Sequence, residues 1–131
     1  FYVYCHNLAP HRKETSHHMD YARESLSMED LIDYFKPIQH ERVIFDPCLG
    51  FSKSYEQNWM ILHHFKTLQR AFSSNQMWLL GFSRKSFLKR KYQRELENEL
   101  TLKLDQFHVQ EILNLNLQGK IIIRTHAPEL L

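Results

Sequence analysis

The sequence predicts an α/β protein in which parallel strands alternate with helices. Four short runs of β-branched or aromatic residues begin near positions 1, 42, 77 and 120. They are apolar on both faces, as are strands of a parallel sheet that helices cover. The intervals between them, about 35–43 residues, suit right-handed strand–helix–strand units. Four such units make half of a (β/α)8 barrel or a small doubly wound sheet.

Each predicted element has local signals of its own. Residues 1–6 (FYVYCH) form the first strand, and a polar, His-rich loop covers about 7–24. The segment SMED at 27–30 is a capping box that opens a helix, which stops before Pro37. A second strand, VIF, follows at 43–45.

A second capping box, SYEQ at 54–57, opens a longer predicted helix. Apolar residues then recur in steps of three or four and predict one continuous helical face: Tyr55, Trp59, Leu62, Phe65, Leu68 and Phe72. The third strand is MWLL at 77–80.

The last third of the chain repeats the pattern. A basic helix follows the third strand, with Phe87 and Leu88 facing inward. Its outward residues form a solvated face to which we assign no function: Lys89, Arg90, Lys91 and Arg94. A further helix is predicted over about 103–117, followed by a fourth strand, III, at 121–123.

Composition and charge exclude several classes of protein. The chain has 131 residues, of which 43% are hydrophobic, enough for one domain with a core. A net charge of +2 is too small to predict a nucleic-acid partner. The sequence shows no apolar run long enough to span a membrane and no signal-peptide pattern. Two cysteines do not indicate a disulfide framework, so a cytoplasmic location is expected.

A polar cluster follows every predicted strand. The clusters are CHN at 5–7, DP at 46–47, SRK at 83–85 and RTH at 124–126. They lie at the carboxyl ends of parallel strands, where ligands bind in both candidate architectures. The turn GFSRKS at 81–86 is the most informative, because burying all its polar side chains would be costly. It therefore favours an anionic or carbonyl-rich ligand over a structural role.

The sequence predicts no metal site. His63 and His64 are adjacent on a helix, so their side chains point about 100° apart. The other paired histidines, His17 and His18, do not indicate a site either. Cys5 and Cys48 could meet at the top of neighbouring strands, but two cysteines without a fixed spacing are weak evidence for zinc.

Three segments together resemble the second half of dihydropteroate synthase. They are DPCLGFSK at 46–53, GFSRKS at 81–86 and RTH at 124–126. In that family they read approximately D-P-G-x-G-F-x-K, G-x-S-R-K-S and R-V-H, at the ends of barrel strands six, seven and eight. Residues 1–6 match strand five, so the resemblance covers the whole chain, and 81–86 is its most specific part.

The resemblance implies the C-terminal half of a TIM (β/α)8 barrel with dihydropteroate synthase activity. Such an enzyme condenses p-aminobenzoate with 6-hydroxymethyl-dihydropterin diphosphate and releases pyrophosphate, in folate biosynthesis. It also implies sulfonamide sensitivity, a homodimer, and Mg²⁺ whose protein ligand lies outside this chain. The chain opens inside a strand without an initiating Met, so we expect a fragment of a longer protein. The isolated piece, lacking half of the ligands and loops, is expected to be inactive.

The same resemblance assigns a role to each residue of the pterin and diphosphate sites. Asp46 would accept hydrogen bonds from the pterin amino and ring N–H groups. Lys85 would donate to the pterin carbonyl and ring nitrogen, and Arg124 would stack on the pterin face. Arg124 and His126 would hold the diphosphate leaving group. Lys85, Arg124 and His126 are thus the predicted catalytic residues, and they act by electrostatic positioning.

Two further residues are assigned to p-aminobenzoate. Ser86 and its backbone amide, at the start of a helix, would receive the carboxylate, because helix N-termini favour anions. Phe51 would flank the aromatic ring. We also expect Asp46, Lys85 and Arg124 to converge on one cavity.

The chain departs from the family pattern at three places. Cys48 stands where the family usually has Gly, Cys5 stands where a Met usually lies beneath the pterin, and THAP at 125–128 replaces the usual V-H-D. Two alternatives remain open: another pterin-binding barrel, such as a methyltetrahydrofolate-dependent methyltransferase domain, and a non-catalytic relative. The methyltransferase alternative does not predict the SRKS turn at 83–86.

Overall fold

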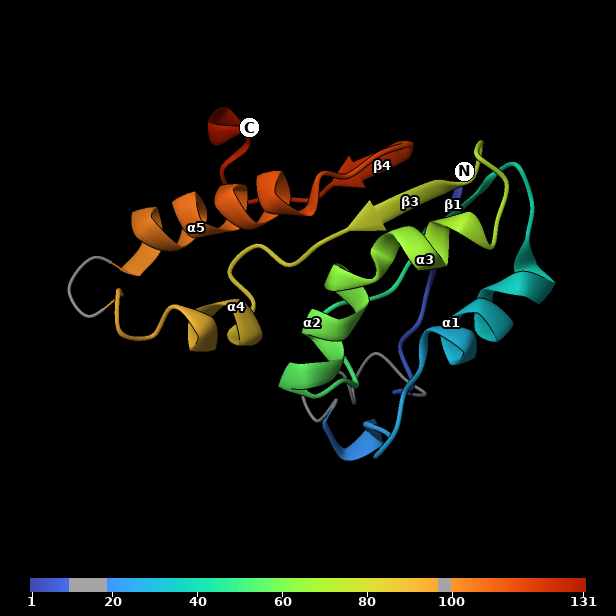
Figure 1. Cartoon of the computed structure of the whole chain (residues 1–131), viewed down its shortest axis with the longest axis horizontal. Helices are drawn as coiled ribbons and strands as arrows, with labels where there is room; N and C mark the ends of the chain where they lie inside the picture. Colours follow the sequence, from blue (N-terminus) through green and yellow to red (C-terminus); the bar gives the residue numbers. More distant parts are fainter. Residues whose placement is uncertain (10–18, 97–99) are drawn as a thin grey trace.

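The computed structural model describes residues 1–9, 19–96 and 100–131. In this part of the chain one parallel sheet runs in the order β1-β2-β3-β4 (Figure 1). Its strands are β1 (Tyr2–Cys5), β2 (Val43–Asp46), β3 (Met77–Leu80) and β4 (Lys120–Ile123). The order and direction confirm the predicted alternation, which is that of part of a (β/α)8 barrel.

The first connection carries α1 (Met28–Phe35) and a short 3-10 turn, η2 (Lys36–Ile38). The predicted capping box is present: the Asp30 amide donates to Ser27 Oγ (3.1 Å), and the Ser27 amide donates to the Asp30 carboxylate (2.8 Å). Pro37 lies in the 3-10 turn directly after the helix. The predicted loop at 7–24 falls partly outside the described residues, as do His17 and His18.

The second connection differs from the sequence prediction, because the expected single helix is two. They are α2 (Tyr55–His63) and α3 (Phe65–Arg70), separated by His64 with φ −107° and ψ 18°. In α2 the polar Gln57 is buried as well as the apolar face, and its Nε2 donates to the Arg23 carbonyl (2.8 Å). The change of direction lets Phe65 of α3 pack edge-on against Trp78 of the sheet, with ring centroids 5.4 Å apart.

The third connection carries α4 (Ser86–Lys91) and α5 (Leu100–Leu115), and η3 (Pro128–Leu130) follows β4. Phe87 and Leu88 are buried, as predicted. The prediction of a merely solvated basic face was incomplete. Lys91 is exposed, but its ammonium pairs with buried Glu111 and lies 4.4 Å from the Trp59 ring centroid. The aliphatic stem of a lysine can cover an apolar surface while its charge finds a partner.

Aromatic side chains form the centre of the core. The Trp78 ring of β3 meets Phe45 of β2 edge-on at 5.4 Å, and Phe35 of α1 at 5.7 Å. All three are almost fully buried. The outer strands are less well covered than predicted, since Tyr2 is 75% and Ile122 39% exposed. No helix of the described residues is long and apolar enough to cross a bilayer.

Two buried histidines predict how stability depends on pH. Neither ring nitrogen of His108 has a hydrogen-bond partner within the described residues, and burial lowers the pKa of His108 to about 4. Burial similarly lowers the pKa of His6 to about 3. An unfolded histidine titrates near pH 6.5. Between these values only the unfolded state takes up the proton, so stability falls as the pH falls below about 6.5.

We expect His108→Leu to reduce the slope of the unfolding free energy against pH by about 1 kcal/mol per pH unit near pH 5. The variant keeps an apolar contact with Phe82, whose ring lies 4.5 Å from the imidazole. Urea unfolding of the full chain at pH 7 and pH 5 measures the effect. His64→Gln, at an exposed site, serves as the control and should leave the dependence unchanged. An equal pH dependence in wild type and His108→Leu would contradict this explanation.

Candidate functional site

The turn after β2 contains residues in the left-handed backbone conformation and is held by the buried side-chain amide of Asn58. Cys48, Gly50 and Ser52 have φ values of 56°, 82° and 50°. The Gly50 amide donates to Asn58 Oδ1 (2.7 Å), and Asn58 Nδ2 donates to the Ser54 carbonyl (2.8 Å). Cys48 therefore adopts the backbone conformation that glycine accepts most readily. Glycine, which the family usually has at this position, would adopt this conformation without strain.

A buried lysine holds this turn against the end of β1. Lys53 is 2% exposed, and its ammonium donates to the carbonyls of His6 (2.7 Å), Phe51 (3.1 Å) and Cys48 (3.3 Å). Burial lowers the pKa of Lys53 to about 8. At neutral pH the amine is still mainly protonated, so all three of its N–H groups can donate.

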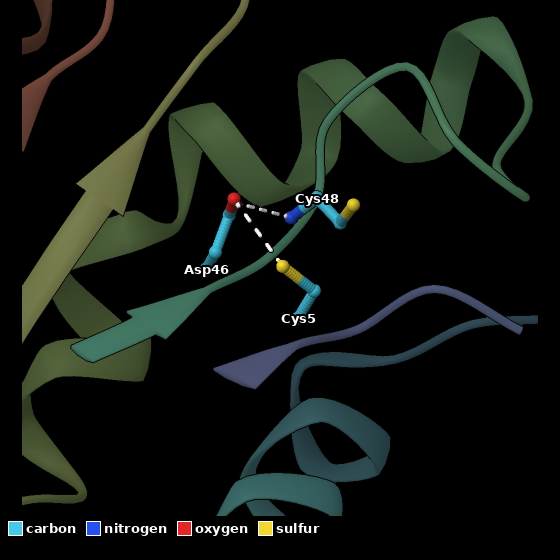
Figure 2. Close-up of side chains that lie close together, drawn as sticks. All are labelled: Cys5, Asp46 and Cys48. Carbon is cyan, nitrogen blue, oxygen red and sulfur yellow. Dashed lines mark hydrogen bonds between the residues drawn. The ribbon is translucent and has the colours of Figure 1, made fainter. Parts of the chain in front are cut away.

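Asp46 is the last residue of β2, next to the turn that follows it (Figure 2). Its Oδ1 accepts the Cys48 amide (2.7 Å), and its Oδ2 lies 3.6 Å from the Cys5 thiol, which donates. Burial raises the pKa of Asp46, and the hydrogen bonds and the charges of Lys53 and Arg124 oppose this rise. The carboxylate is thus partly desolvated, and further N–H donors from a ligand would stabilise its charged form.

One residue of the turn after β3 stabilises the fold. This corrects the prediction that the polar side chains of the turn favour a ligand over a structural role. Arg84 has a φ of 58° and donates Nε and Nη2 to both oxygens of Asp105 (3.0 and 2.8 Å). Asp105 is only 5% exposed, and Arg84 lowers its pKa. Such a two-point pair is geometrically specific. Arg84 therefore holds α5 against this turn.

Lys85, the next residue, points back to the turn after β2. Its ammonium lies 3.7 Å from the centroid of the Phe51 ring. A Cβ added to Gly50 would come within 3.0 Å of Lys85 Cδ, so the absence of a side chain there makes room for the lysine. Burial and then the charge of Arg124 lower the pKa of Lys85.

His126 is oriented by the same turn. Ser83 is 3% exposed, and its hydroxyl meets the His126 amide (3.2 Å) and Nδ1 (2.9 Å). A hollow of about 250 Å³ opens here. It is lined by Gly81, Ser83, Arg84, Lys85, Arg124 and His126.

The structure brings most of the predicted site residues together. Lys85, Arg124 and His126 share one hollow. Asp46 is not on the lining of this hollow but lies close enough for the Arg124 charge to affect its pKa. Ser86 begins α4, as predicted. It lines a different hollow of about 220 Å³, which Gly50 also lines. The roles assigned to these residues and to Phe51 remain predictions.

Three residues of the site were not assigned a role from the sequence. Lys53 and Ser83 stand inside DPCLGFSK and GFSRKS, the two segments that resemble the family pattern, so their position in the motif was a usable signal. Asp105 stands in a helix 21 residues beyond Arg84, and no local pattern marks it.

Solved structures of dihydropteroate synthases share this fold. The enzyme from Stenotrophomonas maltophilia with active-site imidazole superposes with a TM-score of 0.69 at 18% identity, over 95% of this chain and 46% of that one. The Thermus thermophilus enzyme in complex with 6HMPPP gives 0.64 at 20%, over 95% and 48%. The Xanthomonas albilineans enzyme with 7,8-dihydropteroate gives 0.62 at 24%, over 95% and 45%.

The chain thus spans less than half the length of each of these three structures. A comparison with curated protein sequences gave no significant match. A family model described as pterin binding enzyme matches residues 12–126, which is most of the chain. The match includes the turn after β2, the turn after β3 and the end of β4. The chain therefore belongs to the pterin-binding enzyme family.

Proposed function

We propose that the chain carries the C-terminal half of a dihydropteroate synthase site, which condenses p-aminobenzoate with 6-hydroxymethyl-dihydropterin diphosphate. The observation that carries the proposal is the convergence of Lys85, Arg124 and His126 on one hollow, with the Asp46 carboxylate at the end of the neighbouring strand β2. A pterin needs paired acceptors for its N–H groups and donors for its carbonyl. A diphosphate needs cations. This cluster offers both kinds of group at one edge of the sheet.

In this proposal the protein positions the reactants and stabilises charge. Asp46 and Lys85 orient the pterin ring, while Arg124 covers its face and, with His126, holds the diphosphate. The bond from the pterin methylene carbon to oxygen breaks, and pyrophosphate leaves with the electron pair. The arylamine nitrogen attacks the cationic methylene and then loses a proton. Preformed positive charge at the leaving group favours this sequence of steps.

The p-aminobenzoate part of the proposal depends on Phe51 and Ser86. The Lys85 ammonium lies 3.7 Å from the centroid of the Phe51 ring, so the ring face that it covers becomes available to a planar ligand only if the ammonium turns to the pterin carbonyl. The hollow beside Ser86 lies next to the same turn through Gly50. Binding of the two substrates would therefore be linked through Lys85.

Magnesium does not fit the side chains of this part of the chain. In the described residues, the group that could hold a metal comprises Cys5, Asp46 and Cys48. Mg²⁺ prefers oxygen ligands in octahedral geometry, whereas thiolates select softer ions. None of the proposed steps requires Mg²⁺ on these side chains, and the protein ligand of Mg²⁺ is predicted to lie outside this chain. A cytoplasmic location, a homodimer and sulfonamide sensitivity belong to the same proposal.

Asp46→Asn in the full-length protein should weaken pterin binding by about 2–4 kcal/mol. The substitution keeps an acceptor for the Cys48 amide but faces the pterin donors with an NH₂ group. Isothermal titration calorimetry with the dihydropterin diphosphate measures the loss. Asp33→Asn, at an exposed position of α1, is the matched control. An affinity equal to that of wild type would rule out the role of Asp46.

Lys85→Met should reduce p-aminobenzoate-dependent pyrophosphate release by two or more orders of magnitude, since removing one preformed donor typically costs about 10²–10³ in rate. Lys89→Met, on the exposed face of α4, makes the same change in charge and should retain the rate of pyrophosphate release.

Wild-type protein that transfers a methyl group to or from a folate, and releases no pyrophosphate, would instead favour the methyltransferase alternative.

A further inference from the structure

Three potential metal ligands meet at the carboxyl end of β1 and β2. Cys5, Asp46 and Cys48 each offer one ligand atom, and these atoms lie within 4.8 Å of one another. Both cysteines are half-buried and neither is in a disulfide. Figure 2 shows the three side chains around the start of the turn. The sequence alone left this pair of cysteines without a third ligand.

We propose that Cys5, Cys48 and Asp46 bind a thiophilic divalent cation of the Zn²⁺ type, with the fourth position open. Zinc–sulfur bonds of about 2.3 Å and zinc–oxygen bonds of about 2.0 Å in a tetrahedron place sulfur and oxygen about 3.5 Å apart. The observed separation of Cys5 Sγ and Asp46 Oδ2 is 3.6 Å. One edge of the tetrahedron therefore exists already, and Cys48 Sγ is within reach of both atoms.

The backbone holds the three ligands in place. Cys5 and Asp46 are directly paired across the parallel β1–β2 ladder, so their side chains leave the sheet on the same face. Oδ1 of Asp46 already accepts the Cys48 amide at 2.7 Å, which leaves Oδ2 directed at the Cys5 thiol. Hydrogen bonding of the second carboxylate oxygen is the usual way in which a protein orients such a ligand.

The negative charge of the ligands would offset that of a dication. Metal ligands bind deprotonated, so two thiolates and a carboxylate bring three negative charges. A divalent ion offsets two of these charges, and the cations Lys53, Lys85 and Arg124 lie near enough to act on the remaining one.

Asp46 would then serve two ligands, and a metal ion on Oδ2 would exclude the pterin N–H groups. This consequence rests on the proposed function, whereas the metal site rests on the three side chains alone. Zinc would therefore act as a competitive inhibitor of pterin binding in this protein.

The test uses the full chain, kept reduced with a phosphine and stripped of metal, and titrated with Co²⁺ in the absence of pterin. We expect a near-ultraviolet thiolate-to-cobalt charge-transfer band that Zn²⁺ abolishes and a large excess of Mg²⁺ does not. Cys5→Ala and Cys48→Gly should each weaken Co²⁺ and Zn²⁺ binding at least tenfold. Glycine suits the φ of 56° at position 48, so this variant retains the fold. His63→Gln, which removes an exposed imidazole, is the control.

A wild-type chain without the charge-transfer band, or variants that bind both ions as tightly as wild type, would overturn the proposal. In a second measurement, Zn²⁺ should weaken pterin binding to wild type and not to Cys48→Gly. Because cobalt binding is read without pterin, failure of the dihydropteroate synthase proposal would leave the metal result intact.

Discussion

The site depends on one buried cation, Lys53, whose ammonium ties the end of β1 to the turn after β2. Each of its three N–H groups donates to a carbonyl, on His6, Phe51 and Cys48. These carbonyls point inward from irregular backbone, where an unpaired polar group is costly. A single lysine therefore closes the turn without secondary structure. It also fixes the positions of Phe51 and of the segment that follows Asp46.

The turns at the strand ends hold the backbone in unusual conformations. Cys48, Ser52 and Arg84 are non-glycine residues with positive φ, and all three lie just beyond β2 or β3. A residue in this region is less stable by about 1 kcal/mol or more, and such residues cluster at ligand sites. At Arg84 the conformation separates two neighbouring cations: Arg84 turns to Asp105 of α5, and Lys85 turns to Phe51.

Electrostatics decide which ligands suit this edge of the sheet. Lys53, Lys85 and Arg124 surround a single carboxylate, Asp46, whose pKa the charges of Lys53 and Arg124 help to lower against the effect of burial. The excess of positive charge suits a diphosphate. A metal ion at the same edge would depend on the negative charge of its own ligands to offset these cations. It would compete with the pterin N–H groups, not with the diphosphate, for the Asp46 carboxylate.

Much of the fold was predictable because its signals are local. The spacing of apolar residues, the capping boxes and the turn residues all depend on neighbours within a few positions. The strands, both capping boxes and the parallel order were therefore predicted from the sequence. The segments GFSRKS and DPCLGFSK similarly indicated where the site lies. The break at His64 was not predictable, because the apolar spacing continues through it, and packing against Trp78 decides the direction of α3.

The tertiary structure alone decided which polar side chains are used internally and which remain for a ligand. Arg84 and Lys85 are adjacent cations in the sequence, and only the position of α5 supplies Asp105 to the first of them. Cys5 and Asp46 are 41 residues apart, and only the register of β1 on β2 places the thiol beside the carboxylate. These outcomes depend on contacts between distant segments, whose relative positions are set by the packing of the whole core rather than by any local pattern.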